Sequence, residues 1–386
     1  EGDVLVVFAN GQERRLLIGR RATFLDSNGR PLPEGIRSKE FMPNADVTIT
    51  AEFEDGRPVL RTLQLGHRPL APRAGGPGPA KGGPTRALLA RPTTGLVPLT
   101  QMTAKDRYGE EDGGLYGGGS NEPPNEHRTL AEAALANVVP RGRDGSPDTA
   151  GTIGFVSISM SNATQEFAAF KRLADADPVK SPRVALVDCA QGGQTMARWA
   201  EAEGRCWNEA LRRLEAAGVS PAQVQVAWVK LANAGPTGDL AQHGRQLERD
   251  TVKTLQLLRR RFPNLQVAYL SSRIYGGYAT TALNPEPFAY EGGFVVRWVI
   301  QGQLRGAAEL NADSNRGEVV APVLLWGPYL WADGRAGRQQ DGLVYLPEDF
   351  ANDGTHPSPS GVAKIAREML RFFETDQFAK RWFTDK

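Results

Sequence analysis

The sequence is poor in residues that bind metals. It has two cysteines and four histidines in 386 residues. The spacing of Cys189 and Cys206 matches no zinc motif and the histidines are scattered, so no metal site is expected. The sequence is equally compatible with one disulfide, in an exported protein, and with two free, buried thiols.

Long runs of charge or of apolar residues are also lacking. The net charge is +2, and the longest basic run is the three arginines at 259–261, within a stretch predicted to be helical. Nucleic acid is therefore not an expected partner. No apolar run approaches the roughly 20 residues that a membrane-spanning helix needs. The chain starts at Glu1 without a signal peptide, as an exported enzyme without its leader or a shortened chain would. We expect a secreted or periplasmic protein.

Composition divides the chain into three parts. Residues 1–66 alternate in polarity around Asn10-Gly11 and Asp55-Gly56, which favour tight hairpins, and predict a small β-sandwich-like domain. Residues 67–96 are rich in proline and glycine, cannot build a core and predict an extended linker. Residues 97–386 form the third part, whose regular core begins at residue 151.

The third part alternates short apolar runs with helical stretches. The predicted strands are 153–158, 184–187, 224–229, 265–270 and 319–326. The predicted helices include 130–137, 207–217, 240–262 and 294–310. Five strands joined by crossover helices predict a flavodoxin-like, three-layer α/β/α fold with a five-stranded parallel sheet. Ligands of such sheets bind beyond the carboxyl ends of the strands.

Candidate site residues follow each of the first three strands at that edge. Ser161 lies at a strand-to-helix turn, where its hydroxyl could attack an acyl carbon, although Ser161 or Asn162 could instead cap the helix. Gly193 has no Cβ to block its N–H, although it could equally belong to an ordinary turn. Asn233 could donate its amide to an oxyanion or simply start the turn before Gly235-Pro236.

The segments after the last two strands supply further candidates. Asp353 and His356 precede a helix that is predicted to start at Ser358-Pro359. Their three-residue separation lets the carboxylate hold one imidazole nitrogen while the other faces outward. After the fourth strand, three side chains are expected to line the same mouth and contact substrate, unless they pack within their loop: Arg273, Tyr275 and Tyr278.

Serine, glycine, asparagine and an Asp/His pair thus occur in this order, each after a different strand. Over roughly residues 151–386 the chain resembles the SGNH hydrolase (GDSL esterase) superfamily. Ser161-Asn162 and the segment from Gly192 to Trp199 resemble most closely the sialate O-acetylesterase-like carbohydrate esterases. Met160 and Leu231 depart from the superfamily pattern, which has Asp or Gln before the serine and glycine two residues before the asparagine.

The resemblance implies a serine esterase that removes O-acetyl groups from carbohydrate. It implies a triad of Ser161, His356 and Asp353, with Ser159 as a second candidate nucleophile. It also implies an oxyanion hole of Ser161, Gly193 and Asn233, and it requires neither a metal nor an organic cofactor. The expected partner is a small ester or an acetylated carbohydrate; the oligomeric state is not predicted. Alternatives are a non-catalytic carbohydrate-binding protein on the same fold, a general esterase or lipase of non-sugar esters, and a scaffold in which the β domain carries the function.

Overall fold

The computed structural model describes residues 4–9, 12–26, 30–35, 38, 47–54, 57–65 and 91–385. The chain divides into two compact units, Glu1–Thr85 and Arg86–Lys386, which are described separately. Most of the predicted linker, up to residue 90, lies outside the described residues. Residues 91–96, the last part of the predicted linker, belong to the second unit. The backbone N–H of Thr94 donates to Asp333, and that of Arg91 donates to the carbonyl of Gly277.

The first unit contains one small sheet. Its strands are β1 (Val4–Ala9), β2 (Gln12–Leu25), β3 (Val47–Glu54) and β4 (Arg57–Leu65), in the order β1-β2-β4-β3. β1 with β2 and β3 with β4 are antiparallel pairs, whereas β2 and β4 are parallel. The two predicted hairpin turns, residues 10–11 and 55–56, lie outside the described residues. The predicted β character of this part is confirmed, but the described strands form one sheet and not the two packed sheets of a sandwich.

The second unit is built on a five-stranded parallel sheet. Its strands are β5 (Ile153–Ile158), β6 (Val184–Asp188), β7 (Val224–Lys230), β8 (Val267–Ser271) and β9 (Val323–Trp326). They are ordered β6-β5-β7-β8-β9, with every neighbouring pair parallel. Every residue of β5, β7, β8 and β9 is buried, as expected for strands that are covered on both faces.

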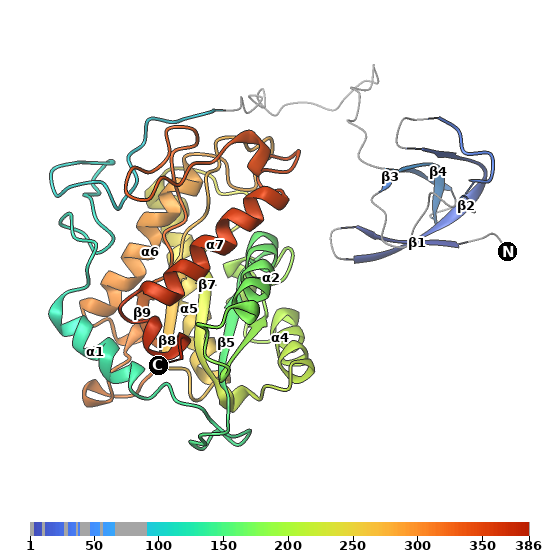
Figure 1. Ribbon diagram of the computed structural model, residues 1–386. Coiled ribbons are helices and arrows are strands. Elements are labelled where there is room, and N and C mark those ends of the chain that lie inside the picture. Colours follow the sequence, from blue (N-terminus) through green and yellow to red (C-terminus); the bar gives the residue numbers. More distant parts are fainter. Residues whose placement is uncertain are drawn as a thin grey trace. The chain divides into compact units, whose positions relative to one another are not determined.

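Helices form the outer layers (Figure 1). They are α1 (Asn125–Leu135), α2 (Ser161–Ala176), α3 (Met196–Trp199), α4 (Arg205–Ala216), α5 (Arg245–Arg261), α6 (Phe288–Leu304), α7 (Pro359–Thr375) and α8 (Lys380–Phe383). α2 packs against α7, while α5 packs against α3 and α6. The predicted three-layer α/β/α fold is confirmed. In the described part of the chain, no helix combines the length and the apolarity needed to cross a bilayer.

Several predicted boundaries are wrong. α1 begins at Asn125 and not at residue 130, α6 ends at Leu304 and not at residue 310, and β9 begins at Val323 and not at residue 319. α6 begins at Phe288, not at residue 294. The predicted start follows the pair Gly292-Gly293, because glycine weakens a helix. In the structure both glycines are buried inside α6, and a Cβ on Gly293 would lie 3.3 Å from the side chain of Leu99. Glycine therefore serves close packing of the preceding loop on this helix.

The two cysteines are free and buried. The sulfur of Cys189 faces the carbonyl of Ala210 at 3.8 Å, and that of Cys206 faces the carbonyl of Arg198 at 3.6 Å. Of the two alternatives that the sequence left open, the structure therefore has the free thiols.

Candidate active site

The strand order places the candidate residues at one edge of the sheet. The chain moves from β5 outward to β6 and then back across to β7, so the order reverses between β5 and β7. Ligands of open α/β sheets bind at such a switch point, beyond the carboxyl ends of the strands. Ser161 follows β5 and Asn233 follows β7, so both lie at this point.

Ser161 is the first residue of α2 and bonds to a histidine. Its Oγ lies 2.7 Å from Nε2 of His356. The residue before the helix, Met160, is extended and makes no side-chain capping bond. The side-chain amide of Asn162 donates to the carbonyl of Thr355 at 2.9 Å. Neither Ser161 nor Asn162 therefore caps α2, and the positive end of this helix is left open to an anion.

His356 is held from its other side by a carboxylate. Its Nδ1 lies 2.6 Å from Oδ2 of Asp353, whose Oδ1 accepts the backbone N–H groups of Thr355 and His356, each at 3.0 Å. Burial acts to raise the pKa of Asp353, but these hydrogen bonds outweigh it and lower the pKa to about 2. The structure thus brings Ser161, His356 and Asp353 into one hydrogen-bonded chain, with the carboxylate ionised.

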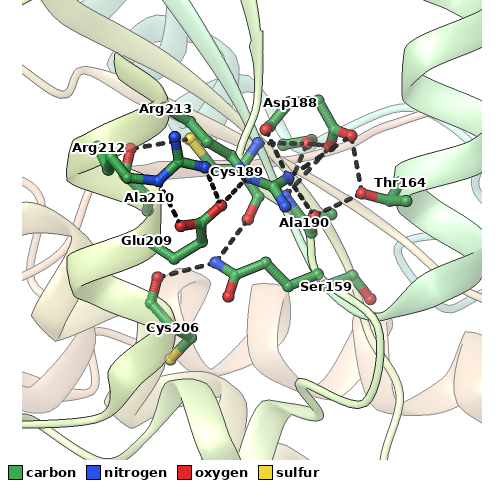
Figure 2. A network of polar contacts seen from close by, with 12 residues as sticks. Ser159, Thr164, Asp188, Cys189, Ala190, Cys206, Glu209, Ala210, Arg212 and Arg213 are labelled. Atoms are coloured by element: carbon green, nitrogen blue, oxygen red, sulfur yellow. Dashed lines mark hydrogen bonds and ion pairs between the residues drawn. The ribbon is translucent and has the colours of Figure 1, made fainter. Parts of the chain in front are cut away.

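Gly193 lies in the loop after β6 and has a φ of +75°. A Cβ there would meet no atom within 4 Å, so the backbone conformation, and not the available space, favours glycine. Figure 2 shows the polar contacts that hold the start of this loop. Asp188 accepts from the hydroxyl of Thr164 on α2 at 2.7 Å, and Arg213 on α4 donates to the carbonyl of Ala190 at 2.8 Å. The loop is therefore tied to the helix that carries Ser161.

The side chain of Asn233 has a defined orientation. Its Oδ1 accepts the backbone N–H of Ala197 at 3.0 Å, and its Nδ2 donates to Oδ2 of Asp250 at 2.7 Å. A primary amide has two N–H groups, so one donor of Asn233 is left for another acceptor. The Asp250 contact is not evident from the sequence, because α5 is recognisable there only as an amphipathic helix.

A buried group of charges was missed in the sequence. Nζ of Lys230, at the end of β7, lies 2.6 Å from both carboxylate oxygens of Glu166 on α2. The two side chains are only 2% and 0% exposed. Burial lowers the pKa of Lys230 to about 8 and raises the pKa of Glu166. Lys230 and Glu166 lie 64 residues apart in the sequence, and no motif indicates that these two side chains meet.

The three predicted substrate contacts are packed in the structure. Arg273 is 4% exposed, and its Nε has no hydrogen-bond partner among the described residues. The hydroxyl of Tyr275 donates to the carbonyl of Arg91 at 2.6 Å, and that of Tyr278 to the carbonyl of Tyr345 at 3.1 Å. Both hydroxyls are thus engaged, and contact of these three side chains with a substrate stays a prediction.

Two clefts border the candidate site. One, of about 820 Å³, includes Gly193 and Asn233 in its wall and is here called the His243 cleft, after a histidine that also lines it. The wall of the other cleft, of about 500 Å³, includes Tyr278 and Arg335. It also includes Asn352 and Gly354, the two residues on either side of Asp353. Among the residues that the structure describes, no group of three or more histidine, cysteine, aspartate or glutamate side chains is placed to hold a metal ion.

Comparison with known proteins gives weak similarities of fold. No family model matches the chain, and no curated protein does. An acetylxylan esterase from Geobacillus stearothermophilus, in a catalytic mutant, superposes with a TM-score of 0.35 and 16% identity, over 64% of this chain and 100% of the other. A putative acylhydrolase from Bacteroides fragilis gives a TM-score of 0.30 and 12% identity, over 65% and 97%. The periplasmic domain of a Salmonella ser. Paratyphi A lipopolysaccharide acetyltransferase gives 0.31 and 10%, over 64% and 95%.

Proposed function

We propose that the second unit is a serine esterase of the SGNH type that hydrolyses carboxylic esters, with O-acetylated carbohydrate as its substrate. The observation that carries the proposal is the hydrogen-bonded chain from Ser161 through His356 to Asp353, with distances of 2.7 and 2.6 Å. A hydroxyl, an imidazole and a carboxylate in this order form the arrangement that activates a serine for acyl transfer.

In the proposed reaction, Oγ of Ser161 attacks the ester carbonyl carbon while Nε2 of His356 takes its proton. Asp353 fixes the imidazole tautomer through Nδ1 and stabilises the imidazolium. The tetrahedral intermediate collapses when its bond to the alcohol oxygen breaks, and His356 returns the proton to that oxygen. Water, deprotonated by His356, then attacks the acyl-enzyme, and the released serine oxygen regains a proton.

The negative oxygen of the intermediate needs donors that are already in place. The open amino end of α2 offers the N–H of Ser161, and the left-handed backbone of Gly193 offers a second N–H. The amide of Asn233, held by Ala197 and Asp250, offers the third. The three groups follow three different strands, β5, β6 and β7. Loss of one such donor typically costs about 10²–10³ in kcat.

The test compares two serines in one turn. Ser161→Ala is expected to abolish release of p-nitrophenol from its acetate, with an unchanged melting temperature. Ser159→Ala is the matched control, because Ser159 is 2% exposed and its hydroxyl donates to the backbone carbonyl of Lys230 at 2.5 Å. The control is expected to retain activity. Unchanged turnover in Ser161→Ala, or loss of turnover only in Ser159→Ala, would contradict the proposal.

The acyl group is tested with a series of p-nitrophenyl esters from acetate to octanoate. A kcat/KM that falls steeply beyond acetate supports deacetylation. Equal or higher values on long chains would favour the alternative of a general esterase or lipase.

A further inference from the structure

The His243 cleft contains a second histidine–carboxylate pair. Nε2 of His243 lies 2.5 Å from Oε2 of Glu291 on α6, and Oε1 of Glu291 accepts the hydroxyl of Tyr108 at 2.6 Å. The side chains of His243 and Glu291 are only 7% and 6% exposed. Tyr108, in turn, stacks on Phe294 with a centroid distance of 5.5 Å. Tyr108 lies in the long irregular segment before α1. This segment and α6 therefore both hold the His243–Glu291 pair in place.

His243 lines the cleft from a segment of irregular backbone. The segment Leu240–Gly244 is a single π-helical turn before α5, a feature that is frequent at functional sites. The ring stands edge-on to Phe288 at 4.9 Å. Since Glu291 takes Nε2, Nδ1 is the nitrogen left for a ligand, and it makes no hydrogen bond among the described residues. The carboxylate accepts N–H from Nε2, so in the neutral ring Nδ1 is an acceptor.

The wall of the cleft continues from His243 to the proposed oxyanion hole. Gln246 donates to Oδ1 of Asp250 at 2.9 Å, and Oδ2 of Asp250 accepts the amide of Asn233 at 2.7 Å. Thr237 and Gln242 add a hydroxyl and an amide, while Leu247 and Phe288 supply apolar surface. Hydrogen-bonding groups on an apolar base suit a polyhydroxylated ring. An alkyl chain would bury several of these groups without partners, at a cost for each.

We infer that the His243 cleft binds the alcohol part of the ester, that this alcohol is a sugar, and that His243 determines specificity by accepting a hydrogen bond from a sugar hydroxyl at Nδ1. The inference rests on the proposed function. A carbonyl oxygen held by Gly193 and Asn233 places one substituent of the ester on the side of this cleft. An acetyl group needs only a small fraction of about 820 Å³, which leaves the cleft for the alcohol.

The second cleft is the competing place for the sugar, and its chemistry is less suitable. Pro92, Pro347, Phe350 and Ala351 make much of its wall apolar, and Arg335 is exposed there. It offers few groups that could pair with several hydroxyls. Arg335→Ala is therefore the matched control for changes at His243.

The test measures kcat and KM for two acetate esters, mono-O-acetylated xylobiose and n-butyl acetate. Replacing His243 by alanine is expected to raise KM for the sugar ester about tenfold, the loss of one hydrogen bond. The ratio of kcat/KM between the sugar and butyl esters should fall by a similar factor. Arg335→Ala should leave this ratio within twofold.

A second variant covers the case in which His243→Ala fails to fold. In Glu291→Gln, the amide oxygen can keep the Tyr108 bond while its N–H₂ donates to Nε2, which turns Nδ1 from an acceptor into a donor. The sugar hydroxyl must then accept where it donated, so this variant should raise KM on the sugar ester by less than His243→Ala does, with little change in melting temperature. A merely structural role of the pair would move the melting temperature and leave the substrate ratio constant.

The outcomes separate the two proposals. If the wild type hydrolyses both esters and neither His243→Ala nor Glu291→Gln changes their ratio more than twofold, the assignment of the sugar to the His243 cleft is wrong and the esterase proposal stands. A larger change in Arg335→Ala moves the sugar to the second cleft and also overturns the inference. If the wild type hydrolyses no ester, the esterase proposal fails, together with the inference that rests on it.

Discussion

Two histidine–carboxylate pairs lie in the second unit, and their nitrogen–oxygen distances are nearly the same. Nδ1 of His356 lies 2.6 Å from Asp353, and Nε2 of His243 lies 2.5 Å from Glu291. They differ in what meets the other ring nitrogen. His356 faces a hydroxyl at the start of a helix, whereas Nδ1 of His243 has no hydrogen-bond partner among the described residues, and this residue lines a cleft. A paired imidazole thus becomes a candidate base only where a nucleophile and oxyanion donors adjoin it.

A third histidine shows a different environment. Nε2 of His127 on α1 lies 2.6 Å from the carbonyl of Leu324, and the residue is 3% exposed. Burial lowers the pKa of His127, which favours its neutral ring. Within the described part of the chain, the ring of His127 bonds only to this backbone carbonyl, so His127 is a structural reference for the other two histidines.

The largest expected effect is the loss of kcat when His356 is replaced, and this loss should distinguish His356 from His243 and His127. His356→Gln should lower kcat on p-nitrophenyl acetate by about 10⁴, because the serine loses its base. His243→Gln should act mainly on KM for sugar esters. His127→Gln should lower the melting temperature and retain kcat per folded molecule. Steady-state kinetics with calorimetry on all three variants checks this; a loss of kcat at His127 as large as at His356 would contradict the comparison.

The second effect concerns stability and not rate. Lys230→Met leaves Glu166 as an unpaired buried carboxylate, so the free energy of unfolding should fall by about 3–5 kcal/mol. Adding Glu166→Gln removes the unpaired charge and should recover part of the loss. Urea unfolding of the single and double variants measures the difference. Equal stability of Lys230→Met and the wild type would show that the pair contributes nothing.

A smaller rate effect is expected at the oxyanion hole. Asn233→Ala should lower kcat by about 10²–10³ and leave KM nearly constant, because the amide is proposed to act on the transition state. If Asn233 only holds the loop together, the melting temperature should fall while the activity of the folded fraction persists. The two readouts therefore distinguish a catalytic from a structural asparagine.

The smallest effect is the contribution of Asp353 to acid stability. Its pKa is lowered from 3.8 to about 2 in the folded chain, so its stabilising contribution is fully present above the unfolded value. That contribution is lost as the pH falls through the folded value. The difference in melting temperature between the wild type and Asp353→Asn should therefore shrink between about pH 4 and pH 2. A constant difference over this interval would mean that the carboxylate is not held in its charged form.

The sequence was informative where a pattern repeats or a strand ends. The five strands follow from apolar runs, and the helix start at Ser358-Pro359 follows from capping chemistry. The segment positions of Ser161, Gly193, Asn233, Asp353 and His356 follow from one topological rule. What the sequence could not give is pairing across the fold. Glu291 is one polar residue on a largely apolar helix, and only the packing of three distant segments brings it to His243 and Tyr108.

The packed state of Tyr275 and Tyr278 illustrates the same limit. Both follow β8 at the correct edge, but a strand-end position does not determine whether an aromatic ring turns outward or inward. The rings pack edge to face at 5.2 Å, and their hydroxyls donate to the carbonyl groups of Arg91 and Tyr345. Aromatic burial and hydrogen bonding account for the inward orientation.

The most direct test of the hydrogen-bonded chain from Ser161 through His356 to Asp353 is covalent labelling with a fluorophosphonate, followed by peptide mapping. This reagent reacts with activated serines. We expect one label per chain, on Ser161, and a much slower reaction in His356→Gln. No labelling of the folded wild type, or a label on a different serine, would contradict the proposal.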